Sequence, residues 1–345
     1  MCPSQNIQEL LDEFKANKSI ALFLGTGSDM TGLYPKKDKY KSEFFQVTPD
    51  GKRPFLMSWN NLLLELSKAA CINSDEEKAI NEIKSSPLKA AILKNKLGGS
   101  YIPIIQNWLY TRCNRSILLD SYEWFEAYKE SPSEDRLKET PFASLFTLAD
   151  VILRQPSIKV VFTQNYNNFL SEAMKILLDK NKSDYPCRQN CKPIDIYDGW
   201  RDMPFDEDVF FIYHVHGFIP PPSEMIPQKE NNHIVLSDEE FHQLSKDVFS
   251  WQNVAQLNYL THYTCILLGL SLEDLTSLRL LRYANLERSS EKVYWIKAGD
   301  GEATQLRLLM EYFESQNLCV VNDAEGYTHF YHTLMETVKH KDNGK

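Results

Sequence analysis

Three nearly continuous apolar runs, at residues 20–24, 159–162 and 210–213, constrain the fold of this chain more than any other feature. The first is followed by Gly-Thr-Gly-Ser, the second by Thr-Gln-Asn-Tyr-Asn and the third by His-Val-His-Gly. Apolar runs of this kind are typical of parallel strands that are buried on both faces. The carboxyl ends of parallel strands meet at one edge of an open sheet, where α/β folds bind their ligands. The three segments therefore predict one site built from a glycine turn, an amide cluster and a histidine.

The alternation of strand and helix patterns predicts the fold class. Further strand patterns occur at residues 264–268, 293–296 and 318–321, and helical patterns separate most of the six strands. Helices are expected at residues 7–16, 59–69, 168–179, 238–251, 274–287, 303–315 and 328–340. This order favours an α/β fold with a Rossmann-like, doubly wound parallel sheet. Residues 182–208 carry prolines and charges without periodicity, and a long loop is expected there.

Two segments interrupt this alternation. Helical patterns alone fill the stretch from 75 to 153, in pieces at 75–84, 87–97, 101–119 and 142–153. We therefore predict a helical insertion at residues 70–155 within a single domain that spans residues 1–345. Residues 31–57 are too many for a simple strand-to-helix connection. The sequence Thr-Pro-Asp-Gly at 48–51 is a strong turn signal and predicts a small hairpin within that segment.

Composition and charge argue against several classes of protein. A net charge of −9 and a pI of about 5.5 disfavour direct binding to nucleic acid or to an anionic membrane. No apolar stretch approaches the ~20 residues that span a bilayer, and the N-terminus lacks a signal-peptide core. The seven cysteines are scattered, which favours free thiols in a reducing compartment. The expected location is the cytoplasm.

Two histidines, His214 and His216, lie two residues apart and face the same side of a strand. A His-x-His pair is also a metal-binding pattern, but no carboxylate or cysteine stands at a matching spacing. The only close cysteine pair, Cys187 and Cys191, has no second pair to complete a zinc site, so no metal is expected. Imidazole titrates near neutral pH, which suits a general base. Gly217 permits a sharp turn after His216, which favours His216 as that base and His214 as a packed, hydrogen-bonded neighbour.

The remaining candidates each have two interpretations. Gly25 and Gly27 permit a tight turn and a close approach to a diphosphate. Met30 stands where the dinucleotide fingerprint has its third glycine, so the alternative that this turn is purely structural remains. The amide of Asn165 can hold a water or a hydroxyl, or it can cap the next helix. The segment Gly-Leu-Ser-Leu-Glu-Asp at 269–274 either caps a helix or meets a nucleotide at the sheet edge. The expected catalytic residues are Asn165 and His216, and the expected ligand-binding residues are Gly25, Thr26, Gly27, Ser28, Asp29, Thr163, Gln164, Asn167, Gly269, Ser271 and Asp274.

Taken together, the motifs resemble those of the sirtuin superfamily, which has a Gly-Ala-Gly loop, a Thr-Gln-Asn segment and a His-Gly pair in this order. Here they read Gly25-Thr26-Gly27, Thr163-Gln164-Asn165 and His216-Gly217. Ser58-Trp59, Leu-Ser-x-x-x-Phe at 236–241 and Gly-x-Ser-x-x-Asp at 269–274 resemble bacterial sirtuin-like defence proteins more closely than protein deacetylases. The resemblance covers nearly the whole chain in register.

Two departures from the sirtuin pattern bear on the reaction. The zinc ribbon of deacetylating sirtuins has no counterpart, because only Cys265 and Cys319 follow the His-Gly pair. The Asp that usually closes the Thr-Gln-Asn motif is Asn167 here. Both departures favour water over an acyl-lysine peptide as the acceptor.

The resemblance implies NAD⁺ as the substrate and cleavage of its nicotinamide–ribose bond to nicotinamide and ADP-ribose. Asn165 would orient the water and a ribose hydroxyl, His216 would accept the proton, the 25–28 loop would hold the diphosphate, and Ser271 with Asp274 would meet the adenosine. It also implies an anti-phage, abortive-infection effector, a homo-oligomer, and a partner such as a HerA-type ATPase or an Argonaute-type protein. An NAD-dependent protein-lysine deacylase and a non-catalytic NAD or ADP-ribose sensor are the alternatives.

Overall fold

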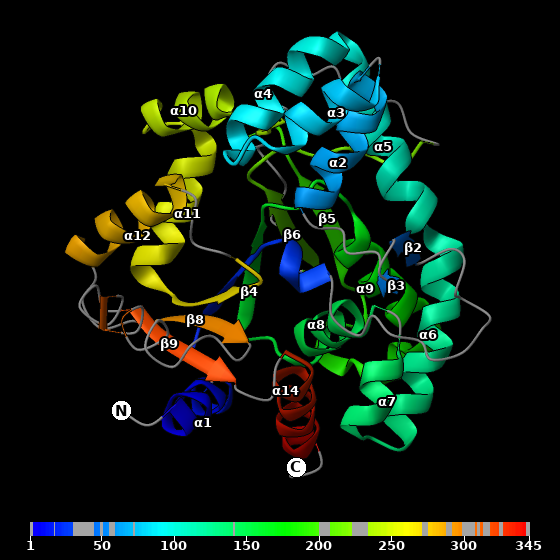
Figure 1. The fold of residues 1–345 in the computed structure, drawn as a ribbon. Helices are drawn as coiled ribbons and strands as arrows, with labels where there is room; N and C mark the ends of the chain where they lie inside the picture. Colours follow the sequence, from blue (N-terminus) through cyan, green and yellow to red (C-terminus); the bar gives the residue numbers. More distant parts are fainter. Residues whose placement is uncertain are drawn as a thin grey trace.

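A seven-stranded sheet forms the centre of the molecule (Figure 1). The computed structural model describes residues 3–16, 18–29, 45–48, 51–54, 59–71, 73–140, 142–199, 208–222, 234–270, 275–287, 292–298, 308, 311–312, 318–323 and 327–342. The strands of the sheet are β1 (Ile20–Leu24), β4 (Ile158–Thr163), β5 (Lys192–Ile196), β6 (Val209–His214), β7 (Thr264–Leu268), β8 (Val293–Ala298) and β9 (Leu318–Asp323). They lie in the order β5-β6-β4-β1-β7-β8-β9, and every neighbouring pair is parallel. With helices on both faces, this confirms the predicted α/β, Rossmann-like, doubly wound sheet.

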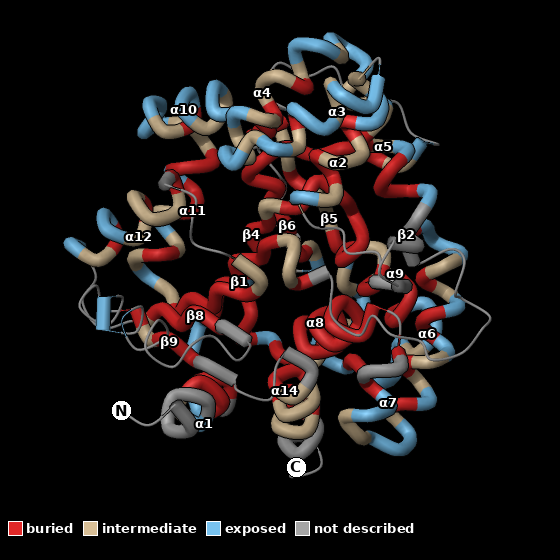
Figure 2. The backbone as a smooth tube through the Cα atoms, in the orientation of Figure 1, coloured by how far each residue is buried: buried red, intermediate tan, exposed pale blue. Residues whose placement is uncertain are grey.

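Successive side chains of a strand point to opposite faces of the sheet, and the core divides accordingly. In β1, Ile20, Leu22 and Leu24 join one buried apolar cluster, whereas Ala21 and Phe23 join a second. Both clusters continue across the neighbouring strands, so the sheet is buried on both sides, as Figure 2 shows for its central strands. This explains why the strand sequences lack an alternation of polar and apolar residues.

The helices in the described part of the chain form two layers and a further block, which shares the buried core of the first layer (Figure 1). They are α1 (Pro3–Lys15), α2 (Trp59–Ala70), α3 (Ser74–Asn81), α4 (Ser86–Leu97), α5 (Tyr101–Arg112), α6 (Arg115–Glu130), α7 (Glu134–Glu139), α8 (Ala143–Arg154), α9 (Phe169–Asn181), α10 (Asp238–Lys246), α11 (Trp251–His262), α12 (Leu275–Glu287) and α14 (Tyr327–Asp342). Helices α1, α8, α9 and α14 share the first cluster with the sheet, and α11 and α12 share the second. Helices α2 to α7 precede α8 in the chain and pack mainly on one another, on α8, α9 and α14, and on α10. The single-domain division with an insertion at 70–155 stays a prediction.

Three of the expected elements differ from those in the structure. The loop prediction for residues 182–208 is wrong at 192–196, where β5 pairs with β6 at the edge of the sheet. Its sequence Lys-Pro-Ile-Asp-Ile hides the strand, because proline is tolerated mainly on edge strands and weakens a strand pattern. The single helices expected at 101–119 and 238–251 are also wrong, since each is divided by a short break.

Polar caps cause both breaks. Asn114 is extended, and its side chain accepts a hydrogen bond from the N–H of Ile117, which starts α6 anew. Ser250 accepts in the same way from the N–H of Asn253 at the start of α11. The capping box predicted at the start of α10 is present, with the Ser237 N–H donating to the Glu240 carboxylate at 2.7 Å.

The predicted hairpin is present as β2 (Phe45–Thr48) and β3 (Gly51–Pro54), which pair antiparallel. Its second strand begins at Gly51, the last residue of the turn signal. The expected helix at 303–315 lies outside the described residues except for 308, 311 and 312, which are helical. None of the helices in the described part of the chain is long and apolar enough to cross a membrane.

Candidate functional site

The topology of the sheet places a crevice beside β1. The chain leaves β1 toward β4 on one side and returns later to β7 on the other. Such a reversal of strand order opens a gap at the carboxyl ends of the strands, which is the usual ligand site of doubly wound sheets. The Gly-Thr-Gly-Ser turn follows β1 at this point, the Thr-Gln-Asn segment ends β4, and Gly269 ends β7.

A cleft of about 810 Å³ lies at this edge of the sheet. Its lining combines strand ends with side chains of α2, α4, α5, α10 and α12, so the helical block and the sheet form it together. Among the predicted site residues, the cleft is lined by Gly25, Thr26, Gln164, Asn165, Asn167, His216 and Gly269. Ser28 and Thr163 are buried behind this lining. Ser271 and Asp274 lie outside the described residues, as does the side chain of Asp29.

The glycine turn packs directly against the end of β7. Gly25 N–H donates to the carbonyl of Leu268 at 2.9 Å, and Gly27 N–H donates to the carbonyl of Gly269 at 3.2 Å. A Cβ on Gly25 would lie 2.4 Å from the Gly269 oxygen, and one on Gly27 would lie 2.7 Å from the Gly269 Cα. The glycines are therefore required for the close contact between two loops. The N–H groups of Gly25, Gly27 and Ser28 are already used in hydrogen bonds within the protein.

Asn165 is held on several sides at the end of β4. Its side-chain NH₂ faces the Gly25 carbonyl at 3.3 Å and the Ser28 hydroxyl oxygen at 3.5 Å. A carbonyl oxygen only accepts hydrogen bonds, so this contact fixes which end of the amide faces the glycine turn. The Asn165 N–H donates to the Thr163 hydroxyl oxygen at 3.1 Å. Asn165 is only 5% exposed, and its Oδ1 has no hydrogen-bond partner among the described residues.

A buried oxygen without a hydrogen-bond donor lowers the stability of the fold unless a water or a ligand donates to it. Because Asn165 also lines the cleft, a donor bound in the cleft is a candidate partner for its Oδ1. The helix-cap interpretation of Asn165 does not hold. Asn167 performs that task instead, accepting from the N–H of Phe169 at 3.1 Å at the start of α9.

His216 reaches the same cleft from the end of β6. It is 7% exposed, and its ring is nearly perpendicular to that of Phe241, with a centroid distance of 5.3 Å and an interplanar angle of 88°. Its carbonyl accepts from the Val235 N–H at 2.9 Å, which fixes the backbone at this point. The following Gly217 has a φ of 91°, which a residue with a side chain rarely adopts, so the predicted sharp turn after His216 is present.

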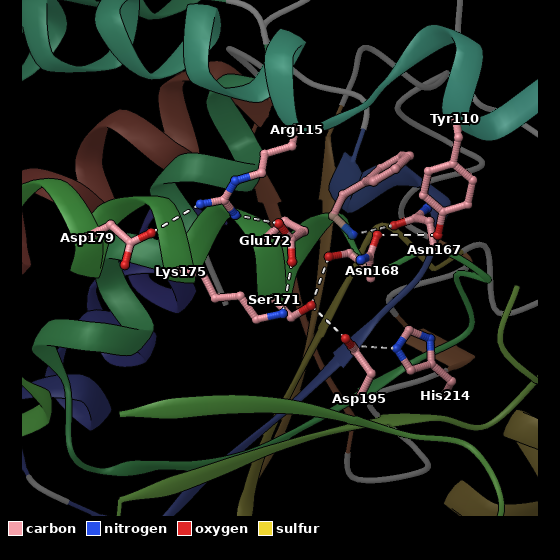
Figure 3. Close-up of polar contacts among 11 residues, drawn as sticks. Tyr110, Arg115, Asn167, Asn168, Ser171, Glu172, Lys175, Asp179, Asp195 and His214 are labelled. Atoms are coloured by element: carbon pink, nitrogen blue, oxygen red, sulfur yellow. Dashed lines mark hydrogen bonds and ion pairs between the residues drawn. The ribbon is translucent and has the colours of Figure 1, made fainter. Parts of the chain in front are cut away.

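His214 lies beneath the cleft in a polar chain that the sequence did not reveal. Its Nδ1 lies 2.8 Å from the carbonyl oxygen of Asn165, and its Nε2 lies 2.8 Å from Oδ1 of Asp195. The Ser171 hydroxyl of α9 lies 2.6 Å from the other Asp195 oxygen. Figure 3 shows the run from Ser171 through Asp195 to His214. Asp195 was missed because it belongs to β5, the strand taken for a loop.

The cleft wall contains further residues that sequence reasoning did not assign. Trp59, Trp108 and Phe241 contribute aromatic surface, and Lys84 and His242 contribute groups that can carry positive charge. Of these, Trp59 and Phe241 belonged to recognised motifs, although neither was assigned to the site. Trp108 and His242 come from helices α5 and α10, and Lys84 comes from the short connection between α3 and α4. Nothing in these local sequences marks a site, so only the fold reveals their position.

Gln164 and Tyr166 are fixed by contacts away from β4. Gln164 donates through Nε2 to the Ser277 hydroxyl of α12 at 3.1 Å. The Tyr166 hydroxyl donates to the carbonyl of Val235 at 2.6 Å, and burial raises the pKa of that hydroxyl above its usual value. Tyr166 therefore stays protonated and serves to anchor the segment before α10. No cluster of three or more His, Cys, Asp or Glu side chains suited to a metal occurs within the described ranges.

Comparison with known families supports the sirtuin-like assignment for one part of the chain. Residues 159–321 match the family model described as a SIR2-like domain. The matched part runs from β4 into β9, so it contains Asn165, His214 and His216 but not the glycine turn or the helical block. A search of curated proteins found no match. The match supports a sirtuin-like superfamily domain and an activity related to NAD.

Proposed function

We propose that the protein hydrolyses NAD⁺ in this cleft, cleaving the nicotinamide–ribose bond to give nicotinamide and ADP-ribose. The observation that carries the proposal is the presence of Asn165 and His216 in one cleft within a SIR2-like segment. Their amide and imidazole are the groups that the reaction needs near the glycosidic carbon. The volume of about 810 Å³ is within the range of small-molecule and cofactor sites.

The chemistry requires a stabilised ribosyl cation and a placed water. As the bond between the ribose carbon and the nicotinamide nitrogen breaks, the electron pair leaves with the ring, which becomes neutral. A water then forms the new carbon–oxygen bond and loses one proton. Asn165 Oδ1, which lacks a partner among the described residues, is suited to accept a hydrogen bond from that water or from a ribose hydroxyl. The His216 imidazole takes up the proton.

The contacts of the glycine turn refine the expected diphosphate site. Three of its N–H groups already donate to protein oxygens, so they supply shape rather than free donors. Thr26 lies between the glycines and lines the cleft, which makes it the residue of this turn best placed to meet a phosphate. The adenosine contacts assigned to Ser271 and Asp274 belong to the proposal as well.

The biological role belongs to the same proposal and rests on the resemblance alone. The protein would deplete NAD⁺ as the effector of an anti-phage defence system of the abortive-infection type. It would act as a homo-oligomer with a partner such as a HerA-type ATPase or an Argonaute-type protein, and the helical segment from 75 to 153 would be its assembly surface.

Product analysis tests the activity. Purified protein is incubated with NAD⁺, alone and with the proteins encoded beside it, and nicotinamide and ADP-ribose are followed. We expect His216→Ala and Asn165→Ala each to lower nicotinamide release by about 10²–10⁴-fold while the thermal unfolding midpoint stays close to that of the wild type. A strict requirement for an acylated peptide would indicate a deacylase instead, and binding without turnover would indicate a sensor.

A further inference from the structure

We propose that His214 and Asp195 form a positioning pair that holds the Asn165 peptide in place, and through it the Asn165 amide in the cleft. The structural part of the proposal stands on its own, and its effect on turnover rests on the proposed hydrolase function. Neither His214 nor Asp195 lines the cleft, so neither residue is catalytic in this assignment.

The register of the sheet creates the pair. β6 lies between β4 and β5, and His214 on β6 stands beside Thr163 on β4. Its ring therefore lies close to the carbonyl of Asn165, two residues beyond Thr163, and contacts it through Nδ1 at 2.8 Å. On the other side Asp195 of β5 contacts Nε2 at 2.8 Å, so one imidazole connects three parallel strands.

The hydrogen-bond chemistry defines the proton content of the pair. A peptide carbonyl only accepts, so Nδ1 of His214 must carry a hydrogen. The second contact then needs one more hydrogen, either on Nε2 or on the carboxyl of Asp195. In both cases the pair is neutral overall, which fits its burial, with His214 only 1% exposed.

The Asn165 side chain by itself is weakly held. Its two amide contacts, at 3.3 and 3.5 Å, are longer than the usual 2.9–3.0 Å of an N–H···O bond. The contact from His214 to the Asn165 carbonyl, at 2.8 Å, is shorter than either. Asp195 is in turn anchored to α9 by Ser171 at 2.6 Å, and the His214 ring packs on Phe218 at 4.8 Å. The contact to the Asn165 carbonyl is therefore the shortest hydrogen bond of Asn165 in the described part of the chain, and together with the N–H bond to Thr163 it restrains the peptide.

A matched pair of variants tests the role. In His214→Asn the side-chain nitrogen takes the place of Nδ1 and can still donate to the Asn165 carbonyl. In His214→Gln the nitrogen takes the place of Nε2, which keeps the contact with residue 195 and loses the one with Asn165. Both are combined with Asp195→Asn, so that neither variant leaves an unpaired buried carboxylate.

We expect the His214→Gln double variant to lose about 100-fold in kcat with KM for NAD⁺ changed less than about threefold. The His214→Asn double variant should keep kcat within about tenfold of wild type. Tyr185→Phe is the control, because it removes a buried 2.7 Å hydrogen bond to Asp150, outside the cleft lining. Equal losses of kcat in both double variants, or none in the His214→Gln variant, would overturn the positioning role.

A second measurement is independent of any NADase activity. In the full chain labelled with ¹⁵N-histidine, His214 is identified as the resonance absent from the His214→Asn variant. We expect its Nδ1 to show the chemical shift of a protonated ring nitrogen. A bare Nδ1 would overturn the proposal even if the protein hydrolyses NAD⁺. A protonated Nδ1 in a chain without turnover would support the pair and refute only the proposed function.

Discussion

At the scale of single residues, the closest backbone contact described at the cleft is made by Gly269. Its φ is +66°, and a Cβ there would lie 2.3 Å from the Ser28 nitrogen and 2.6 Å from the Gly27 carbonyl carbon. These neighbours are backbone atoms of the turn after β1, so they cannot move aside as a flexible side chain does. The ends of β1 and β7 can therefore approach this closely only because residue 269 is a glycine.

Gly269→Ala is expected to lower the free energy of unfolding by at least about 1–3 kcal/mol, from the left-handed backbone and the clash combined. The measurement is urea denaturation followed by circular dichroism. Gly99→Ala is the matched control, because a Cβ at Gly99 meets nothing within 4 Å. A Gly269→Ala protein as stable as the Gly99→Ala protein would show that the two loops are not packed as described.

The candidate residues differ in how far the sequence could identify them. Asn165 and His216 directly follow strong strand patterns, so their meeting at one sheet edge could be predicted. The hydrogen bond that the Asn167 side chain accepts at the start of α9 could not, because the sequence favours Asn168 as the cap of that helix. Asp195 was hidden for a different reason, since Pro193 beside it weakens the pattern of an edge strand.

At the scale of elements, an ion pair between Lys94 and Glu240 links α4 to α10, and both helices line the cleft. Both side chains are partly exposed, at 30% and 13%, so the pair contributes at most about 1 kcal/mol. Glu240 also belongs to the capping box of α10, which makes Lys94 the cleaner position to change.

Lys94→Gln is expected to raise KM for NAD⁺ by about two- to fivefold with kcat unchanged, because the two sides of the cleft are held together less firmly. Steady-state kinetics at low salt measures this. Lys96→Gln is the control, because Lys96 pairs with Glu76 of α3 inside the helical block at a similar exposure of 32%. The same change of KM in both variants would assign the effect to overall charge rather than to the link across the cleft.

At the scale of the whole molecule, the buried sheet explains how much of the fold could be predicted. Strands buried on both faces, such as β1 and β7, give continuous apolar runs that identify a parallel sheet. Single residues conceal three features of the fold from a periodicity pattern. The proline in β5 weakens its strand pattern, and single capping residues make the breaks before α6 and α11. The position of the helical block over the cleft depends on packing between segments far apart in the chain.

Burial of tyrosine throughout the core predicts how stability depends on pH. Burial raises the pKa of Tyr213 and of Tyr122 to about 12, and it also raises the pKa of Tyr166 and Tyr294. An unfolded tyrosine loses its proton near pH 10. Between pH 10 and 12 the unfolded chain therefore releases protons that the folded protein retains, and stability falls as pH rises.

Tyr213→Phe removes one of these protons, so the free energy of unfolding should decline less steeply above pH 10 in the variant than in the wild type. Below pH 10 the tyrosine is protonated in both the folded and the unfolded chain. The free energy of unfolding should therefore change with pH in the same way for the two proteins. Urea denaturation at intervals from pH 8 to pH 12 provides the measurement. Parallel curves over the alkaline range would mean that the ring of Tyr213 on β6 is hydrated, and that this face of the sheet is not closed by α11.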